Sequence, residues 1–119
     1  MKILLVEDHP ALAEISCRLL RDLHGHEVSL AATGAEALAA AGLAIPDLVL
    51  VDLNLPDMTG YEIAKRLRRD PRFDRTVLVA VTGFGSVVDD EHAREAGIDA
   101  HFRKPMDFDV LDELRRAES

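Results

Sequence analysis

The stretch LVLVDLNLPDMTGYE, residues 48–62, joins an uninterrupted apolar run to an acidic residue and then to a helix start. The run Leu48–Val51 contains only Val and Leu, a composition typical of strands that are buried on both faces of a parallel sheet. Thr59, followed three residues later by Glu62, forms a pattern that caps the N-terminus of a helix. The stretch therefore predicts a buried strand that ends just before Asp52 and a helix that follows.

Further apolar runs lie on either side of this stretch and alternate with longer segments of helical period. This alternation predicts strand-helix units around a parallel sheet, with right-handed crossovers that place helices on both faces. We therefore expect a doubly wound α/β fold, whose ligand site lies beyond the carboxyl ends of the strands. The five expected strands are Lys2–Val6, Glu27–Ala31, Asp47–Val51, Thr76–Val81 and Ala100–Phe102.

The helical segments carry their own start and stop signals. The first has Pro10 near its start and repeats Leu and Ile at helical spacing, so we expect this apolar face to pack on the sheet. Gly97 is expected to end the fourth helix, and the last helix is expected to begin near Asp107. The apolar face of the first helix comprises Leu12, Ile15, Leu19, Leu20 and Leu23, and the capping pairs are Thr33 with Glu36, Thr59 with Glu62 and Ser86 with Asp89.

Size and composition restrict the class of protein. At 119 residues, with 48% hydrophobic and 30% charged residues, the chain is expected to form a single domain over 1–119. Its formal net charge of −8 disfavours direct binding to nucleic acid or anionic lipid. No apolar run approaches the roughly 20 residues of a membrane-spanning helix, so no membrane insertion is expected. The single cysteine, Cys17, and the lack of a signal-peptide pattern favour a reducing, cytoplasmic setting.

Polar residues follow the expected strands at the edge where their carboxyl ends meet. Glu7 and Asp8 follow the first strand, and Asp52 follows the third. Thr82 follows the fourth strand and Lys104 the fifth. Three carboxylates brought together repel one another, so they need either retained protons or a hard cation, and we favour a cation such as Mg²⁺. Taken singly, each residue is most simply a solvated loop or strand-end residue, and only the combination indicates a site.

Four motifs in this order resemble the signature regions of bacterial response-regulator receiver domains. The resemblance covers nearly the whole chain and implies a flavodoxin-like (βα)5 fold, with a five-stranded parallel sheet of order 2-1-3-4-5. It also implies a role in two-component or phosphorelay signalling, with a histidine kinase or a histidine phosphotransfer protein as phosphoryl donor. The motifs are LLVEDHP at 4–10, LVLVDLNLPDMTGYE at 48–62, LVAVTG at 78–83 and AHFRKP at 100–105.

The resemblance assigns roles to the residues at the strand ends. Asp52 would be the phosphorylation site, because a carboxylate nucleophile that attacks a phosphoryl group yields an aspartyl-phosphate. Lys104 would contact the phosphoryl group, and Thr82 would donate a hydrogen bond to it once it is attached. Catalysis would be limited to Mg²⁺-dependent self-phosphorylation and autodephosphorylation. The expected Mg²⁺ ligands are Asp8, Asp52, the backbone carbonyl of Asn54 and, through water, Glu7.

The resemblance also implies a switch on the fourth and fifth strands. The family couples its threonine, here Thr82, to an aromatic residue three positions before the lysine, and this residue is His101 here. An imidazole titrates near neutral pH, so switching through His101 would depend on pH. A cis peptide bond between Lys104 and Pro105 would direct the lysine toward the acids. Asn54 and Phe84 occupy the two positions that tune phosphoryl lifetime in the family.

The surface expected to report phosphorylation comprises the fourth helix, the fifth strand and the final helix. Phe84, Val87 and Val88 cannot all face the core, so exposed apolar surface is expected there. A homodimer or a downstream protein would bind through this face. The stretch AREAGIDAHFRKPMDFDVL, residues 93–111, is similar to receivers attached to hybrid sensor kinases, so a stand-alone receiver and a piece of a longer protein both stay open.

Three other functions compete with this interpretation. A phosphatase of the haloacid-dehalogenase type also combines Asp, Thr, Lys and Mg²⁺ ligands, but it places its nucleophile after the first strand within Asp-x-Asp. A flavodoxin-type cofactor carrier needs a hydroxyl- or glycine-rich phosphate loop where this chain has Glu7–Pro10, which would repel phosphate. A receiver-like module that no longer accepts phosphate is disfavoured by the intact set of site residues. Hydrolysis of a generic phosphomonoester, or a bound flavin, would favour the first two.

Overall fold

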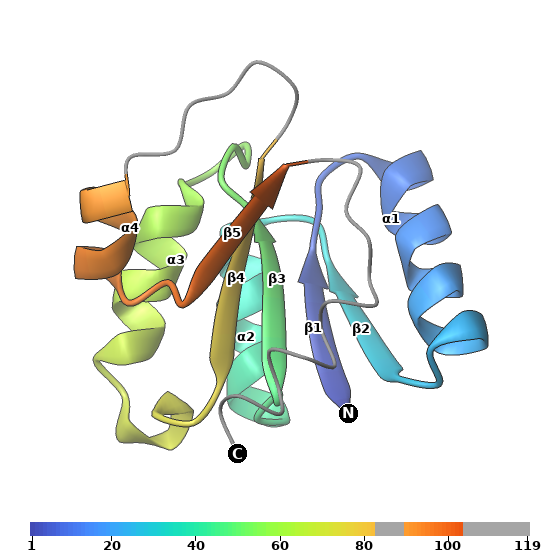
Figure 1. Ribbon diagram of the computed structural model, residues 1–119, viewed down its shortest axis with the longest axis horizontal. Coiled ribbons are helices and arrows are strands. Elements are labelled where there is room, and N and C mark those ends of the chain that lie inside the picture. The colour runs from blue at the N-terminus through green and yellow to red at the C-terminus, as the bar shows by residue number, and fades with distance from the viewer. Residues whose placement is uncertain (83–89, 104–119) are drawn as a thin grey trace.

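The computed structural model of the protein describes residues 1–82 and 90–103, which form a five-stranded parallel sheet with helices around it (Figure 1). The strand order is β2-β1-β3-β4-β5, which confirms the expected doubly wound, flavodoxin-like topology. The expected final helix and the Ser86 and Asp89 capping pair lie outside the described residues. The strands are β1 (Lys2–Val6), β2 (Glu27–Ala31), β3 (Leu48–Asp52), β4 (Val77–Thr82) and β5 (Ala100–Arg103).

Helices lie on both faces of the sheet, as right-handed crossovers require (Figure 1). Within residues 1–82 and 90–103, no helix has the length and apolar character needed to cross a membrane. The helices are α1 (Pro10–Arg18), the π-helical turn η1 (Leu19–Leu23), α2 (Gly34–Leu43), α3 (Gly60–Arg68), the 3-10 turn η2 (Pro71–Phe73) and α4 (Asp90–Ala96).

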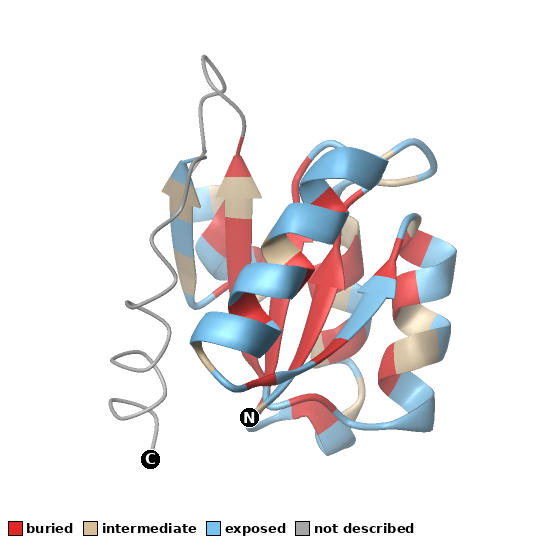
Figure 2. Cartoon of the chain, turned by 90° about the vertical axis from the view of Figure 1, so that its right-hand side faces the viewer, coloured by how far each residue is buried: buried red, intermediate tan, exposed pale blue. Residues whose placement is uncertain are grey.

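Side chains of the strands alternate between two apolar layers. In β1, Leu4 and Val6 pack with buried residues of α2, α3 and α4, while Ile3 and Leu5 pack with buried residues of α1 and η1. Every residue of β3 is buried, as its run of Val and Leu predicts. Figure 2 shows the buried strands enclosed by helices whose outer surfaces are exposed. The packed core of the sheet therefore supports the residues at the ends of its strands.

The predicted sheet-facing side of the first helix is wrong. The helix buries Ala13 and Cys17, and η1 buries Leu20, which is the one residue of the predicted face that reaches the core. The side of α1 that faces the core carries the small residues Ala13 and Cys17, and the chain becomes π-helical after Arg18, so an α-helical period cannot be extended through the segment. The other residues of the predicted face, Leu12, Ile15, Leu19 and Leu23, are between 38% and 73% exposed.

The predicted helix starts and stops are confirmed where the structure describes them. The Thr33 hydroxyl oxygen accepts a hydrogen bond from the backbone N–H of Glu36, and Thr59 does the same for Glu62, at 3.1 and 3.2 Å. Gly97 follows α4 with a φ of 88°, a left-handed conformation that favours glycine. A Cβ at this position would also overlap the side chain of Arg68.

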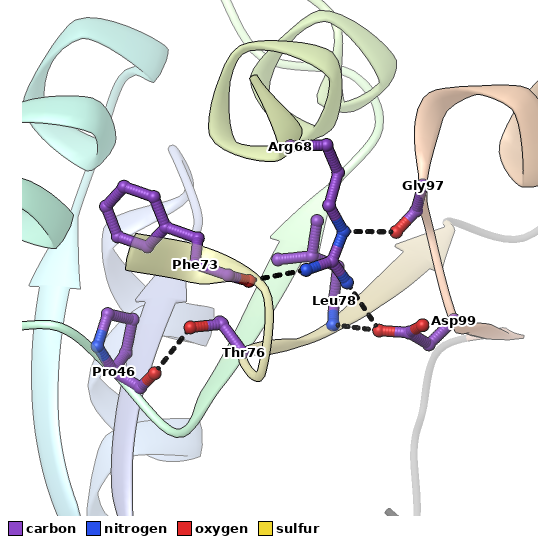
Figure 3. A network of polar contacts seen from close by, with 7 residues as sticks. All are labelled: Pro46, Arg68, Phe73, Thr76, Leu78, Gly97 and Asp99. Atoms are coloured by element: carbon purple, nitrogen blue, oxygen red, sulfur yellow. Dashed lines mark hydrogen bonds and ion pairs between the residues drawn. The ribbon is translucent and has the colours of Figure 1, made fainter. Parts of the chain in front are cut away.

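Arg68 connects the end of α3 to the chain that enters β5 (Figure 3). Its guanidinium donates hydrogen bonds to the carbonyls of Phe73 and Gly97 at 2.6 and 3.0 Å, and its Nη2 lies 2.8 Å from a carboxylate oxygen of Asp99. The same carboxylate accepts the backbone N–H of Leu78 at 2.8 Å. Arg68 therefore fixes the end of α4 and the start of β5 against β4, at the end of the sheet remote from the strand carboxyl ends.

Replacing Arg68 by Ala should lower the free energy of unfolding by about 2 kcal/mol, because two backbone carbonyls and the Asp99 carboxylate lose a charged donor. Urea denaturation measures this change. The matched control is Arg18→Ala, which removes an exposed pair with Glu14 one helical turn away and should change stability by less than about 0.5 kcal/mol. Equal effects of the two substitutions would contradict the proposed importance of the Arg68 network.

Candidate functional site

The carboxyl ends of the parallel strands gather polar residues at one edge of the sheet. Glu7 and Asp8 follow β1 directly. Asp52 and Thr82 are the last residues of β3 and β4, rather than the first residues after them as predicted. Strand pairing continues through these positions, because backbone hydrogen bonding does not depend on the side chain, and Asp52 is in register with Val81. Two of the predicted site residues are therefore held by the sheet itself.

The three predicted acids form one cluster. A carboxylate oxygen from each of Glu7, Asp8 and Asp52 lies within 4.8 Å of the others. Glu7 and Asp52 are only 8% exposed, whereas Asp8 is exposed, so the cluster lies at the protein surface with one side open to solvent. Three oxygen ligands with an open side fit a hard divalent cation that keeps several waters, as Mg²⁺ does. The geometry thus agrees with the expected cation site.

Backbone hydrogen bonds hold the two buried acids in place. The N–H of Glu7 donates to the carbonyl of Ala31 at 3.0 Å, which ties the end of β1 to the end of β2. The N–H of His9 donates to the Glu7 carboxylate at 3.4 Å. The N–H of Asn54 donates to Oδ1 of Asp52 at 2.9 Å and thereby orients that carboxylate. The acids are positioned by the main chain that surrounds them.

The loop after β3 turns tightly beneath Asp52. Asn54 pairs with Thr59 in an isolated antiparallel bridge, and the N–H of Gly60 donates to the carbonyl of Leu53 at 3.1 Å. A Cβ at Gly60 would lie 3.0 Å from the carbonyl oxygen of Asp52, so glycine lets α3 begin directly against the end of β3. This turn places Asn54, a predicted carbonyl ligand, beside the acid cluster in sequence and in space.

Asp57, in the same loop, was not among the predicted site residues. Its carboxylate accepts hydrogen bonds from the N–H groups of Gly34 and Ala35, at 2.8 and 3.0 Å. These N–H groups, at the start of α2, hold the pKa of the Asp57 carboxyl below its usual range. The residues lie 22 and 23 positions apart along the chain, and no local sequence pattern joins them.

Thr82 lies on β4 and His101 on the neighbouring strand β5, and their side chains have different bonding partners. Thr82 is buried, and its hydroxyl donates a hydrogen bond to the carbonyl of Phe102 in β5 at 3.4 Å. The side chain of His101 is 42% exposed, and its Nε2 lies 2.7 Å from a carboxylate oxygen of Asp90 at the start of α4. The imidazole therefore lies on the outer surface between α4 and β5, and its role in switching stays a prediction.

The remaining predicted residues fall outside the part of the chain that the structure describes. They are the lysine Lys104, its neighbour Pro105 with the expected cis peptide bond, and Phe84, Val87 and Val88.

Comparisons of this chain with known proteins all find response regulators. Residues 3–116 match the profile of the response regulator receiver domain. The polar-differentiation response regulator DivK of Brucella ovis is 36% identical over 107 residues, covering 87% of this chain and 84% of that protein. The structure of the chemotaxis response regulator CheY4 of Vibrio cholerae superposes with a TM-score of 0.85 at 30% identity, covering 99% of this chain and 98% of that one.

A further similar structure contains a bound metal ion. It is the receiver domain of the sensor histidine kinase PA1611 from Pseudomonas aeruginosa, which has a magnesium ion coordinated in its active-site cleft. It superposes with a TM-score of 0.83 at 30% identity and covers 98% of this chain and 94% of that one.

Replacing Asp8 by Asn should raise the melting temperature of the metal-free protein by a few degrees, because one of three mutually repelling charges is removed. The same substitution should abolish the rise in melting temperature that millimolar Mg²⁺ produces in the wild type by binding the folded state. Thermal unfolding followed by circular dichroism measures both effects. Asp74→Asn, which removes the carboxylate of a turn residue before β4, is the control and should leave the Mg²⁺ effect unchanged. A Mg²⁺ effect that persists in Asp8→Asn would contradict the assigned site.

Proposed function

This chain belongs to the family of response regulator receiver domains, and on that premise we propose that it accepts a phosphoryl group on Asp52 and signals its presence through α4 and β5. The observation that carries the proposal is the acid cluster: Asp52, held at the end of a fully buried strand, lies with Glu7 and Asp8 within 4.8 Å at the open edge of the sheet. A carboxylate placed there is both fixed in direction and accessible to a donor.

The chemistry of transfer follows from the position of Asp52. One of its carboxylate oxygens attacks the phosphorus of the donor, a new O–P bond forms, and the bond between phosphorus and the donor atom breaks. The donor atom keeps the electron pair of the broken bond and takes a proton from solvent. Asp52 is oriented for the attack by the N–H of Asn54, which donates to its Oδ1. A carboxylate that is already held in one orientation lowers the entropic cost of bringing acceptor and donor together.

Charge is the main obstacle, since an anionic donor must approach three carboxylates. Mg²⁺, when bound, supplies positive charge that offsets both the carboxylates and the phosphoryl oxygens. In this proposal Asp8, Asp52 and the Asn54 carbonyl hold the cation, and Glu7 contributes through water. Lys104 provides a second positive charge. The placement of Glu7, Asp8 and Asp52 at one edge of the sheet supports the three carboxylate roles in this proposal.

Thr82 is the proposed sensor of the phosphoryl group. Its hydroxyl donates to the Phe102 carbonyl at 3.4 Å, a long hydrogen bond that can be exchanged for one to a phosphoryl oxygen. Phe102 neighbours His101, whose imidazole pairs with Asp90 of α4. A change at Thr82 therefore has a short route to β5 and α4, the described part of the proposed binding face for a second copy or a downstream protein.

The proposed donor is a histidine kinase or a histidine phosphotransfer protein, in a cytoplasmic two-component or phosphorelay system. The protein acts on no separate substrate in this proposal. Its only reactions are the Mg²⁺-dependent gain of the phosphoryl group and its hydrolysis.

Incubation with acetyl phosphate or phosphoramidate and Mg²⁺ should add one phosphoryl group to the protein, because the acceptor and cation site are built from this chain alone. Intact-mass spectrometry detects the adduct, which should be stable in acid and labile in base as an acyl phosphate is. Asp52→Asn and removal of Mg²⁺ by a chelator should each abolish it.

The control variant Asp74→Asn removes a carboxylate from a turn residue before β4 and should be phosphorylated like the wild type. An adduct that survives in Asp52→Asn would refute the acceptor assignment. If acetyl phosphate, beryllofluoride and phosphorylated histidine donors all leave the protein unchanged, the chain is a receiver-like module that works without phosphorylation.

A further inference from the structure

The loop that follows the acceptor is tied to a helix that does not otherwise belong to the site. Both carboxylate oxygens of Asp57 are engaged: Oδ1 accepts the N–H of Gly34 at 2.8 Å and Oδ2 accepts the N–H of Ala35 at 3.0 Å. These are N–H groups of the first turn of α2, which lack partners within the helix itself. The contact thus joins the β3–α3 loop to the start of α2.

The start of α2 is in turn connected to the other half of the acid cluster. α2 follows β2 after a short turn, and Ala31, the last residue of β2, accepts the N–H of Glu7. A continuous frame therefore runs from Glu7 through the end of β2 and the first turn of α2 to Asp57. Asp57 lies in the loop that carries Asn54, so this frame connects the acids after β1 with the loop after β3.

Asp57 supports the middle of the β3–α3 loop by its two bonds to the start of α2. The near end is held by the bond from the Asn54 N–H to Asp52, and the far end by the Thr59 cap of α3. Between them, Met58 packs so closely on Gly34 that a Cβ there would overlap its side chain. The helix cap of α2 itself is already supplied by Thr33, so Asp57 is not needed to begin that helix.

We propose that Asp57 is a positioning residue for the cation site: by binding the first turn of α2 it holds the β3–α3 loop so that the Asn54 carbonyl faces the carboxylates of Asp8 and Asp52. This inference rests on the proposed function, because it assumes that the acid cluster binds Mg²⁺. Asp57 does not contact the cation or the phosphoryl group. It acts through the backbone of its own loop, as residues behind metal ligands do.

The test compares Asp57→Ala, Asp57→Asn and a control, Asp70→Ala. Asp70 also accepts a backbone N–H, that of Arg72 at 3.0 Å, and pairs with the Arg72 guanidinium, but it lies after α3 and away from the strand carboxyl ends. The three variants therefore separate a general loss of a carboxylate cap from a loss at this loop. Asn keeps one acceptor oxygen in nearly the same shape, so it should restore part of the function lost in Ala.

Two readouts are needed. The first is amide hydrogen exchange in the metal-free protein, where Asp57→Ala should speed exchange at Gly34, Ala35 and Asn54 while the strands stay protected. The second is the Mg²⁺ dissociation constant from calorimetric titration, which Asp57→Ala should raise about tenfold. Asp57→Asn should fall between Ala and wild type, and Asp70→Ala should match the wild type in both.

The outcomes decide between the two proposals. Faster loop exchange together with weaker Mg²⁺ binding supports the positioning role. Unchanged exchange at Asn54, or unchanged Mg²⁺ affinity in Asp57→Ala, overturns it. If the wild type binds no Mg²⁺ the proposed function fails by itself, and the positioning of a cation site fails with it, whereas normal Mg²⁺ binding that is insensitive to Asp57 refutes the positioning role alone.

Discussion

Mutual repulsion among three carboxylates is the constraint on which the rest of this structure depends. A parallel sheet brings the carboxyl ends of its strands to one edge, and here that edge receives Glu7, Asp8 and Asp52 within 4.8 Å. The apolar packing of the sheet opposes this repulsion, and a bound cation would reduce it. Asp52, the proposed acceptor, ends a strand in which every residue is buried, and the exposed Asp8 lies on the side of the cluster that is open to solvent.

The two ends of the sheet have different roles, one in stabilising the fold and the other in carrying the acid cluster. Remote from the site, Arg68 and Asp99 fasten α3, α4 and β5 to β4. At the site, the Thr82 hydroxyl reaches the Phe102 carbonyl at 3.4 Å, which is long for a hydrogen bond. In the proposed function, a change at Asp52 that draws the Thr82 hydroxyl away from Phe102 would move the near ends of β5 and α4 while the core stays packed.

The sequence predicted the strands and the acid cluster because both follow from local patterns. Runs of Val, Leu and Ile marked β1, β3 and β4 to within one residue of their observed bounds, and the polar residues at the ends of these runs marked the site. The sheet-facing side of α1 was predicted wrongly, because the residues that it buries are the small Ala13 and Cys17 and not the large apolar residues that the pattern favoured. Asp57 was missed because its partners belong to another helix, and only the folded chain brings them together.

A crystal structure of the protein with Mg²⁺ and beryllofluoride, which mimics a phosphoryl group, would show whether Asp52 is the acceptor. We expect beryllium to be bonded to a carboxylate oxygen of Asp52, with Mg²⁺ held by Asp8, Asp52 and the Asn54 carbonyl. We also expect the Thr82 hydroxyl to leave the Phe102 carbonyl and bind a fluoride. Beryllofluoride at another residue, or Asp52 unmodified with the acid cluster free of metal, would show that Asp52 is not the acceptor.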